Sequence, residues 1–240
     1  MLKFILITSV CIGATQAQIV VNSALPITKR IFINPIISQK TNGTRAMYFG
    51  NATQKKNIED SINLILSQSG IDVHFMPEIT WVSDFAYDAS PNTPAAGVAR
   101  PQADLSTMHS STSGAPLFSD ADVINMIFVE IVPGFSAVDD NTSNGLARID
   151  GNAIAVHVGV NLVGFQNGLN VIAGVVAHEI GHNLGLPHEA NNGPNLMSPS
   201  GTTKQLTTAQ NTVIFTNNSG IDGFDSRKQF PHRRNHFQVG

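Results

Sequence analysis

The chain is poor in cysteine and in charge. Its single cysteine, Cys11, lies in an N-terminal apolar run, so the rest of the 240 residues can form no disulfide. Charged residues make up 13% of the sequence, against about 25% in typical soluble proteins. The net charge of −3 argues against a nucleic-acid partner, because such partners require a basic surface.

Long apolar runs are also missing. The N-terminal run over residues 4–14 is too short to span a bilayer, follows the positive Lys3 and precedes the small residue Ala17. This pattern is typical of a secretory signal peptide over residues 1–17, cut near Ala17. We therefore expect a secreted protein, extracellular or periplasmic, with no membrane span.

The remaining length and a hydrophobic content of 42% suit one domain over residues 18–221, followed by a polar, basic tail over 222–240. Apolar spacing predicts helices over 57–69, 169–184 and 207–215. Apolar runs and alternation predict strands over 31–38, 71–75, 123–132 and 152–158, and a short edge strand over 145–149. A Ser-, Thr- and Pro-rich stretch over 87–120 predicts a long surface excursion.

The most informative stretch is residues 178–188, which read HEIGHNLGLPH. His178 and His182 are one helical turn apart and point the same way, opposite the apolar stripe of the predicted helix. Gly185 can turn the chain after the helix and bring His188 back to the same point. Three imidazoles leave one position of a tetrahedral zinc ion open for water. Glu179 is placed to act as the general base on that water.

Fully exposed sheet edges can bind an extended peptide by strand addition. The predicted edge strand provides one, so Gly145, Leu146 and Ala147 are candidate substrate-binding residues. Other histidines have weaker claims: His157 sits in an alternating strand as a packed or surface residue, and His74 and His109 have no spaced partner.

The H-E-x-x-H-x-x-G-x-x-H pattern resembles the metzincin clan of zinc metallopeptidases. This resemblance implies a methionine turn under the zinc, for which Met197 in Asn-Leu-Met-Ser-Pro is suitably spaced. It also implies that residues after Met197, from Pro199 to Gln205, wall the main specificity pocket. The implied fold is α+β: a twisted, mostly parallel sheet with an antiparallel edge strand and two long helices. An upper lobe extends to about residue 185, and a smaller C-terminal lobe covers 186–221.

The subfamily stays open. Glu189, directly after the third histidine, resembles astacins, but the residues after Met197 lack the tyrosine that astacins place near the metal. Matrixins usually carry serine at the position of Glu189 and a cysteine-containing pro-segment. The chain is similar to both groups in part, and we expect an outlying metzincin.

Two functions remain at this point. The first is a secreted zinc endopeptidase that acts as a monomer on protein or peptide substrates, with a separate inhibitor as one means of control. The second is a secreted binding or adhesion protein with a structural zinc ion. Calcium is a weaker expectation than a solvated turn, on hard oxygen ligands at Asp139, Asp140, Asn141 and Asp150.

Overall fold

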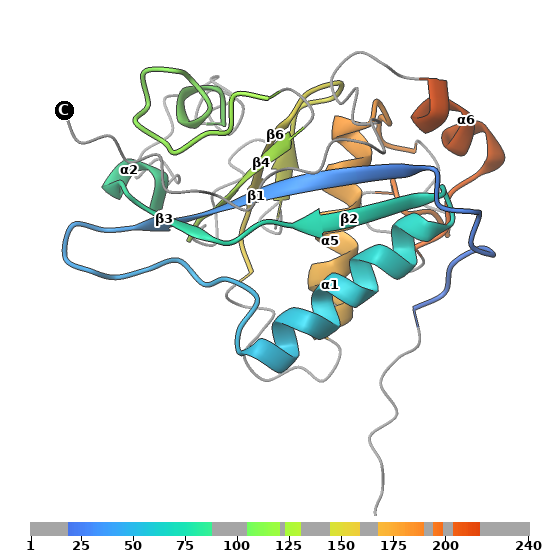
Figure 1. Cartoon of the computed structure of the whole chain (residues 1–240), viewed down its shortest axis with the longest axis horizontal. Helices are drawn as coiled ribbons and strands as arrows, with labels where there is room; N and C mark the ends of the chain where they lie inside the picture. The colour runs from blue at the N-terminus through green and yellow to red at the C-terminus, as the bar shows by residue number, and fades with distance from the viewer. Residues whose placement is uncertain are drawn as a thin grey trace, which may run out of the picture.

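The computed structural model describes residues 19–87, 105–120, 123–130, 145–158, 168–189, 194–198 and 204–216. The predicted signal peptide and basic tail lie outside these residues, so both stay predictions. A six-stranded sheet forms the centre, with the two long helices against one face (Figure 1). None of the helices within the described ranges has the length and apolar character needed to cross a membrane.

The sheet is mostly parallel, as expected. Strand β1 (Lys29–Gln39) pairs in parallel with β4 (Val123–Phe128), which pairs in parallel with β6 (Ala153–Val156). Strand β5 (Gly145–Ala147) closes this side as the antiparallel edge. On its other side, β1 pairs first with β2 (Ile71–Phe75) and then with β3 (Ile79–Val82). The predicted sheet architecture is confirmed.

Pro35 explains why two short strands line one edge of β1. The amide of Met76 donates to the carbonyl of Ile33, so residue 33, and with it residue 35, directs its backbone polar groups toward β2 and β3. Proline has no amide hydrogen to donate at that edge. The break between β2 and β3 falls at this position, where Ile33 pairs with Phe75 and Ile36 with Ile79.

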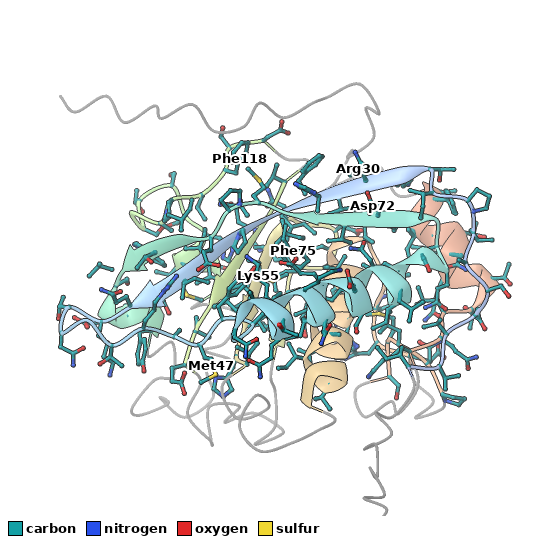
Figure 2. The ribbon with its side chains drawn as sticks, turned by 60° about the horizontal axis from the view of Figure 1, so that its bottom comes forward. Arg30, Met47, Lys55, Asp72, Phe75 and Phe118 are labelled. Atoms are coloured by element: carbon teal, nitrogen blue, oxygen red, sulfur yellow. The ribbon has the colours of Figure 1, made fainter. Side chains whose placement is uncertain are left out.

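Two long helices cover one face of the sheet. Helix α1 (Ala52–Ser67) packs on β2 and against helix α5 (Gly168–Asn183). Figure 2 shows the side chains that fill the layer between α1 and the sheet, and the ion pair of Arg30 with Asp72 across β1 and β2, at 2.8 Å. The short helix α2 (Asp84–Tyr87) follows β3, and α6 (Thr208–Thr216) ends the described chain.

Several predicted boundaries were wrong. Helix α1 begins at residue 52 rather than 57, because Asn51 and Gln54 form a reciprocal capping box ahead of the first apolar residue. The edge strand ends at Ala147, since Asp150 turns the chain with a φ of 55°. Strand β4 ends at Phe128 rather than at residue 132, and the apolar spacing did not reveal β3 or α2.

The stretch over 87–120 is not simply a surface excursion. Its described part, residues 105–120, covers the sheet face opposite the long helices, with Leu105 and Met108 buried against Trp81 and Ile127. All six residues of β4 are consequently buried, as the apolar run predicted. The sheet is therefore packed on both faces, which holds its antiparallel edge and α5 in fixed positions.

Candidate metal centre

Helix α5 ends where the sequence predicts. The amide of Gly185 donates to the carbonyl of His182, and the amide of Leu186 donates to that of Gly181. Gly185 has a φ of +90°, a left-handed conformation that costs glycine little. This turn reverses the chain after the helix and brings His188 back beside its first histidine.

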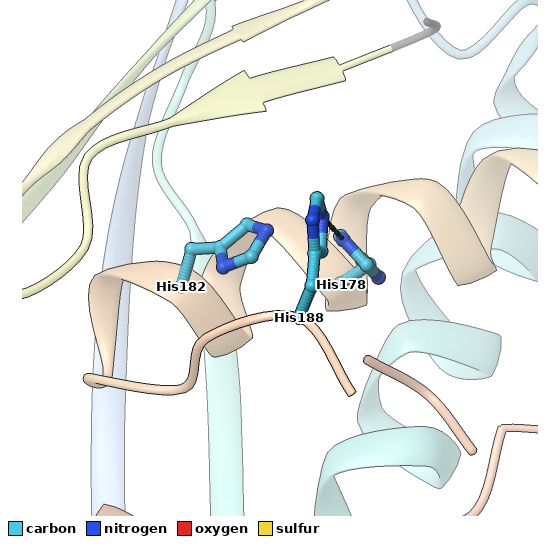
Figure 3. A group of neighbouring side chains, drawn as sticks. All are labelled: His178, His182 and His188. Atoms are coloured by element: carbon cyan, nitrogen blue, oxygen red, sulfur yellow. Dashed lines mark hydrogen bonds between the residues drawn. The ribbon is translucent and has the colours of Figure 1, made fainter. Parts of the chain in front are cut away.

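The three predicted histidines converge (Figure 3). Their ligand nitrogens all lie within 4.8 Å of one another, and Nε2 of His188 lies 3.2 Å from Nε2 of His178. Ring centroids are 4.7 Å apart for His178 and His182 and 4.7 Å for His182 and His188. Within the described ranges, this is the one cluster of three or more His, Cys, Asp or Glu side chains able to share a metal ion.

Backbone carbonyl groups orient two of these rings through contacts with Nδ1, the ring nitrogen opposite the candidate ligand atom. Nδ1 of His178 lies 2.7 Å from the carbonyl oxygen of Leu196, and Nδ1 of His182 lies 2.6 Å from that of Leu186. Because a carbonyl only accepts, each Nδ1 must carry the proton, which leaves the lone pair on Nε2. Both rings are thus set as ligands through Nε2.

The electrostatic environment keeps the imidazoles neutral. Burial lowers the pKa of His178 to about 4, with smaller contributions from the neighbouring histidines and Lys204. Burial also lowers the pKa of His182 and of His188. Since a metal binds only the neutral imidazole, protons compete weakly for this site near neutral pH.

Glu179 lies beside the first histidine and is almost completely buried, with 6% of its surface exposed. Its Oε2 has no hydrogen-bond partner, and burial raises its pKa to about 8 in the metal-free protein. A divalent cation nearby would favour the ionised form. A buried carboxyl group with one unpaired oxygen, next in sequence to one of three converging histidines, is suited to proton transfer rather than to packing.

The candidate methionine turn is the turn at residues 195–198. Met197 is fully buried, its amide donates to Oδ1 of Asn195, and its carbonyl accepts from the amide of Glu189. Its sulfur lies against Gly181, where an added Cβ would be 2.6 Å from Sδ. Met197 therefore packs against α5 at Gly181, and its place under a zinc ion stays a prediction.

The edge strand lies against the same helix. A Cβ added to Gly145 would lie 2.6 Å from Oε1 of Glu179, so the start of β5 touches the candidate base. Asn183, buried at the end of α5, donates from Nδ2 to the carbonyls of Arg148 (2.7 Å) and Ala153 (3.3 Å). Sequence reasoning missed Asn183 and Gly181, although both fall inside the motif.

Other predicted residues are not brought to this centre. His157 is buried with Nδ1 3.3 Å from the carbonyl oxygen of Val129, a packed residue as expected. The ring nitrogens of His109 face the carbonyls of Leu105 and Asn125. The amide of Asp150 donates to His182, and no described residue supports a calcium site. Four residues lie outside the described ranges: Asp139, Asp140, Asn141 and Pro199.

Comparison with known proteins agrees with this geometry. Residues 60–189 match the model of the reprolysin-like metallopeptidase family M12B. No curated protein sequence matches the chain. The fold is similar to that of archaemetzincin from Methanopyrus kandleri, with a TM-score of 0.52 and 16% identity over 80% of this chain and 98% of that one. Archaemetzincin from Archaeoglobus fulgidus aligns with a TM-score of 0.47 and 19% identity, over 77% of this chain and 99% of that one. The expected metzincin-like fold is confirmed.

Proposed function

This chain belongs to the reprolysin-like metallopeptidases of family M12B, and from this premise we propose that it is a secreted zinc endopeptidase with Glu179 as general base. The observation that carries the proposal is the convergence of three ligand nitrogens within 4.8 Å, beside a buried carboxyl group that has an unpaired oxygen. A purely structural zinc site would have no use for that carboxyl group.

The donor set fits zinc. Four-coordinate zinc with Zn–N distances of about 2.0–2.1 Å places neighbouring nitrogens about 3.3 Å apart. The two Nε2 atoms of His178 and His188 are already 3.2 Å apart. The carbonyls behind His178 and His182 fix the tautomer that a metal requires. We propose that His178, His182 and His188 hold one zinc ion.

When bound, zinc acidifies water and polarises a carbonyl group, which are the two requirements of peptide hydrolysis. Glu179 takes the proton of the attacking water on its carboxylate and delivers it to the leaving amine. The low exposure of Glu179 keeps bulk water from competing for this proton. Met197 supports the ligand geometry by packing against α5, and Gly185 supports it by turning the chain after the helix.

The free edge of β5 is the proposed substrate strand partner. Its inner edge pairs with β6, and among the residues that the structure describes it is the last strand on this side of the sheet. An extended peptide can add to the outer edge by main-chain hydrogen bonds, which explains why the enzyme would act within chains rather than only at their ends. Gly145, Leu146 and Ala147 are the proposed contacts.

Export is proposed from the N-terminal residues alone. Lys3, the apolar run over 4–14 and Ala17 support a signal peptide. The rest of the chain contains no cysteine, so its folding depends on no disulfide and is compatible with any compartment. We further propose that the mature protein acts as a monomer. Sequencing the N-terminus of the secreted protein tests the cut near Ala17.

The test of function is cleavage of a degenerate peptide library by the zinc-loaded protein, with and without a chelator. We expect internal cleavage that the chelator abolishes and added zinc restores. Glu179→Gln should bind zinc with an affinity close to that of the wild type but turn over no peptide. Retained turnover in this variant would refute the general-base role, and no cleavage by folded, zinc-loaded wild type would refute the peptidase.

A further inference from the structure

Lys204 lies beside the candidate metal centre. The carbonyl of Gln205, the next residue, accepts from the amide of Leu196 in the methionine turn, at 2.7 Å. The backbone of Lys204 itself is held on both sides. Its amide donates to the carbonyl of Val20 at 3.2 Å, and its carbonyl accepts from Nε2 of the buried Gln68 at 2.6 Å. The position of this residue is therefore fixed by the fold.

The side chain of Lys204 extends along α5. It lies over Gly174, where an added Cβ would be 2.5 Å from Nζ. Gly174 precedes His178 by four residues, so the two occupy the same face of the helix one turn apart.

The direction of β5 shows which part of a substrate would reach Lys204. Gly145, at the start of the strand, touches Glu179, and the carbonyl of Arg148, after its end, accepts from Asn183. The strand thus runs in the same direction as α5. A peptide added to its free edge in antiparallel fashion runs the opposite way. Residues after the scissile bond then lie over the N-terminal half of α5, toward Gly174.

We propose that Lys204 is a specificity residue that selects substrates with an acidic side chain, aspartate or glutamate, directly after the scissile bond. This inference rests on the proposed peptidase function. Gly174 provides the space for the lysine side chain next to the metal ligands. Lys204 is partly buried, and the loss of hydration that this causes lowers the pKa of its ammonium group. A poorly solvated cation gains more from a carboxylate partner than one in bulk water does.

The first test uses quenched peptides that differ only in the residue after the scissile bond: Glu, Gln, Leu or Lys. For the wild type, we expect kcat/KM for Glu to exceed that for Gln by about 30-fold, because a poorly solvated charge loses its partner in the Gln peptide. Lys204→Met should remove the difference between Glu and Gln while keeping cleavage of the Leu peptide. Lys204→Glu should invert the preference toward Lys.

A matched control and a binding measurement complete the design. Lys56→Met removes a highly exposed lysine of α1, away from the centre, and should leave the Glu-to-Gln ratio unchanged. In a Glu179→Gln background, fluorescence anisotropy should show tighter binding of short peptides that begin with Glu than of those that begin with Gln. Lys204→Met should abolish that difference as well.

The outcomes separate the two proposals. If no peptide is cleaved by the wild type but Glu-first peptides bind selectively through Lys204, the peptidase proposal fails, and Lys204 stands only as a residue that binds an acidic side chain. If peptides are cleaved with equal rates for Glu and Gln, or if Lys204→Met keeps the preference, the role of Lys204 is overturned and the peptidase stands.

Discussion

Gly145→Ala tests whether the edge strand positions the carboxylate of Glu179, the proposed general base. Gly145 does not have a left-handed φ, so alanine suits its backbone. The added Cβ would lie 2.6 Å from Oε1 of Glu179, 2.7 Å from Cγ and 2.9 Å from Cδ. Ordinary van der Waals contact begins at 3.4 Å. Either the carboxyl group or strand β5 must therefore move by about 0.8 Å to accommodate the added Cβ.

The expected effect of this shift is a loss of about 100-fold in kcat, since a misplacement of about 1 Å in a catalytic group has that cost. Zinc affinity should stay within about twofold of the wild type by calorimetry, because Glu179 is not a ligand. The assay is hydrolysis of a quenched peptide at saturating zinc.

Leu146→Ala is the matched control for disturbing the strand itself. The side chain of Leu146 packs with the residues on the opposite sheet face, away from Glu179. We expect this variant to lose much less activity than Gly145→Ala. If Gly145→Ala keeps kcat within about threefold of the wild type, or if both variants lose the same amount, the positioning argument is wrong.

Three further predictions concern this region, and a fourth concerns His109. Asn183→Ala should lower the free energy of urea unfolding by about 2 kcal/mol, because two buried carbonyls lose their donor; an unchanged midpoint would contradict this. Gly181→Ala should lower the melting temperature, since its Cβ would lie 2.6 Å from Sδ of Met197, and Met197→Ala in that background should recover part of the loss. Chelation should lower the melting temperature, and zinc should restore it in a concentration-dependent manner. Burial holds the pKa of His109 below its usual 6.5, so protons favour the unfolded chain and stability should fall as pH drops below 6.5; His109→Asn should flatten this dependence in calorimetric scans, and an identical slope would refute it.

The zinc motif and its helix were predictable because their signals are local. The apolar stripe predicted a helix over 169–184 against the observed 168–183, and Gly185 turns the chain as its position required. Histidines four residues apart share a helix face in any α-helix. Neither conclusion depends on the rest of the fold.

Other local elements lacked such a signal. Residues 52–56, Ala-Thr-Gln-Lys-Lys, have no apolar spacing, and only the capping box at Asn51 marks the start of α1. Strand β3 has one buried residue, Trp81, and therefore no clear alternation. Residues 105–120 resemble a polar surface stretch in sequence, yet Leu105 and Met108 cover one face of the sheet. That apolar face exists only once the strands have paired, so the local sequence does not reveal it.

The sequence by itself determined the candidate zinc ligands, the candidate base and the metzincin resemblance, because helical periodicity and a glycine turn fix these over eleven consecutive residues. The tertiary structure decided what surrounds them. Gly145 against Glu179, and Lys204 over Gly174, are contacts between segments about 30 residues apart, which only sheet pairing and helix packing bring together. The candidate catalytic residue types are therefore encoded locally, whereas their positioning and the proposed charge next to the scissile bond come from the fold.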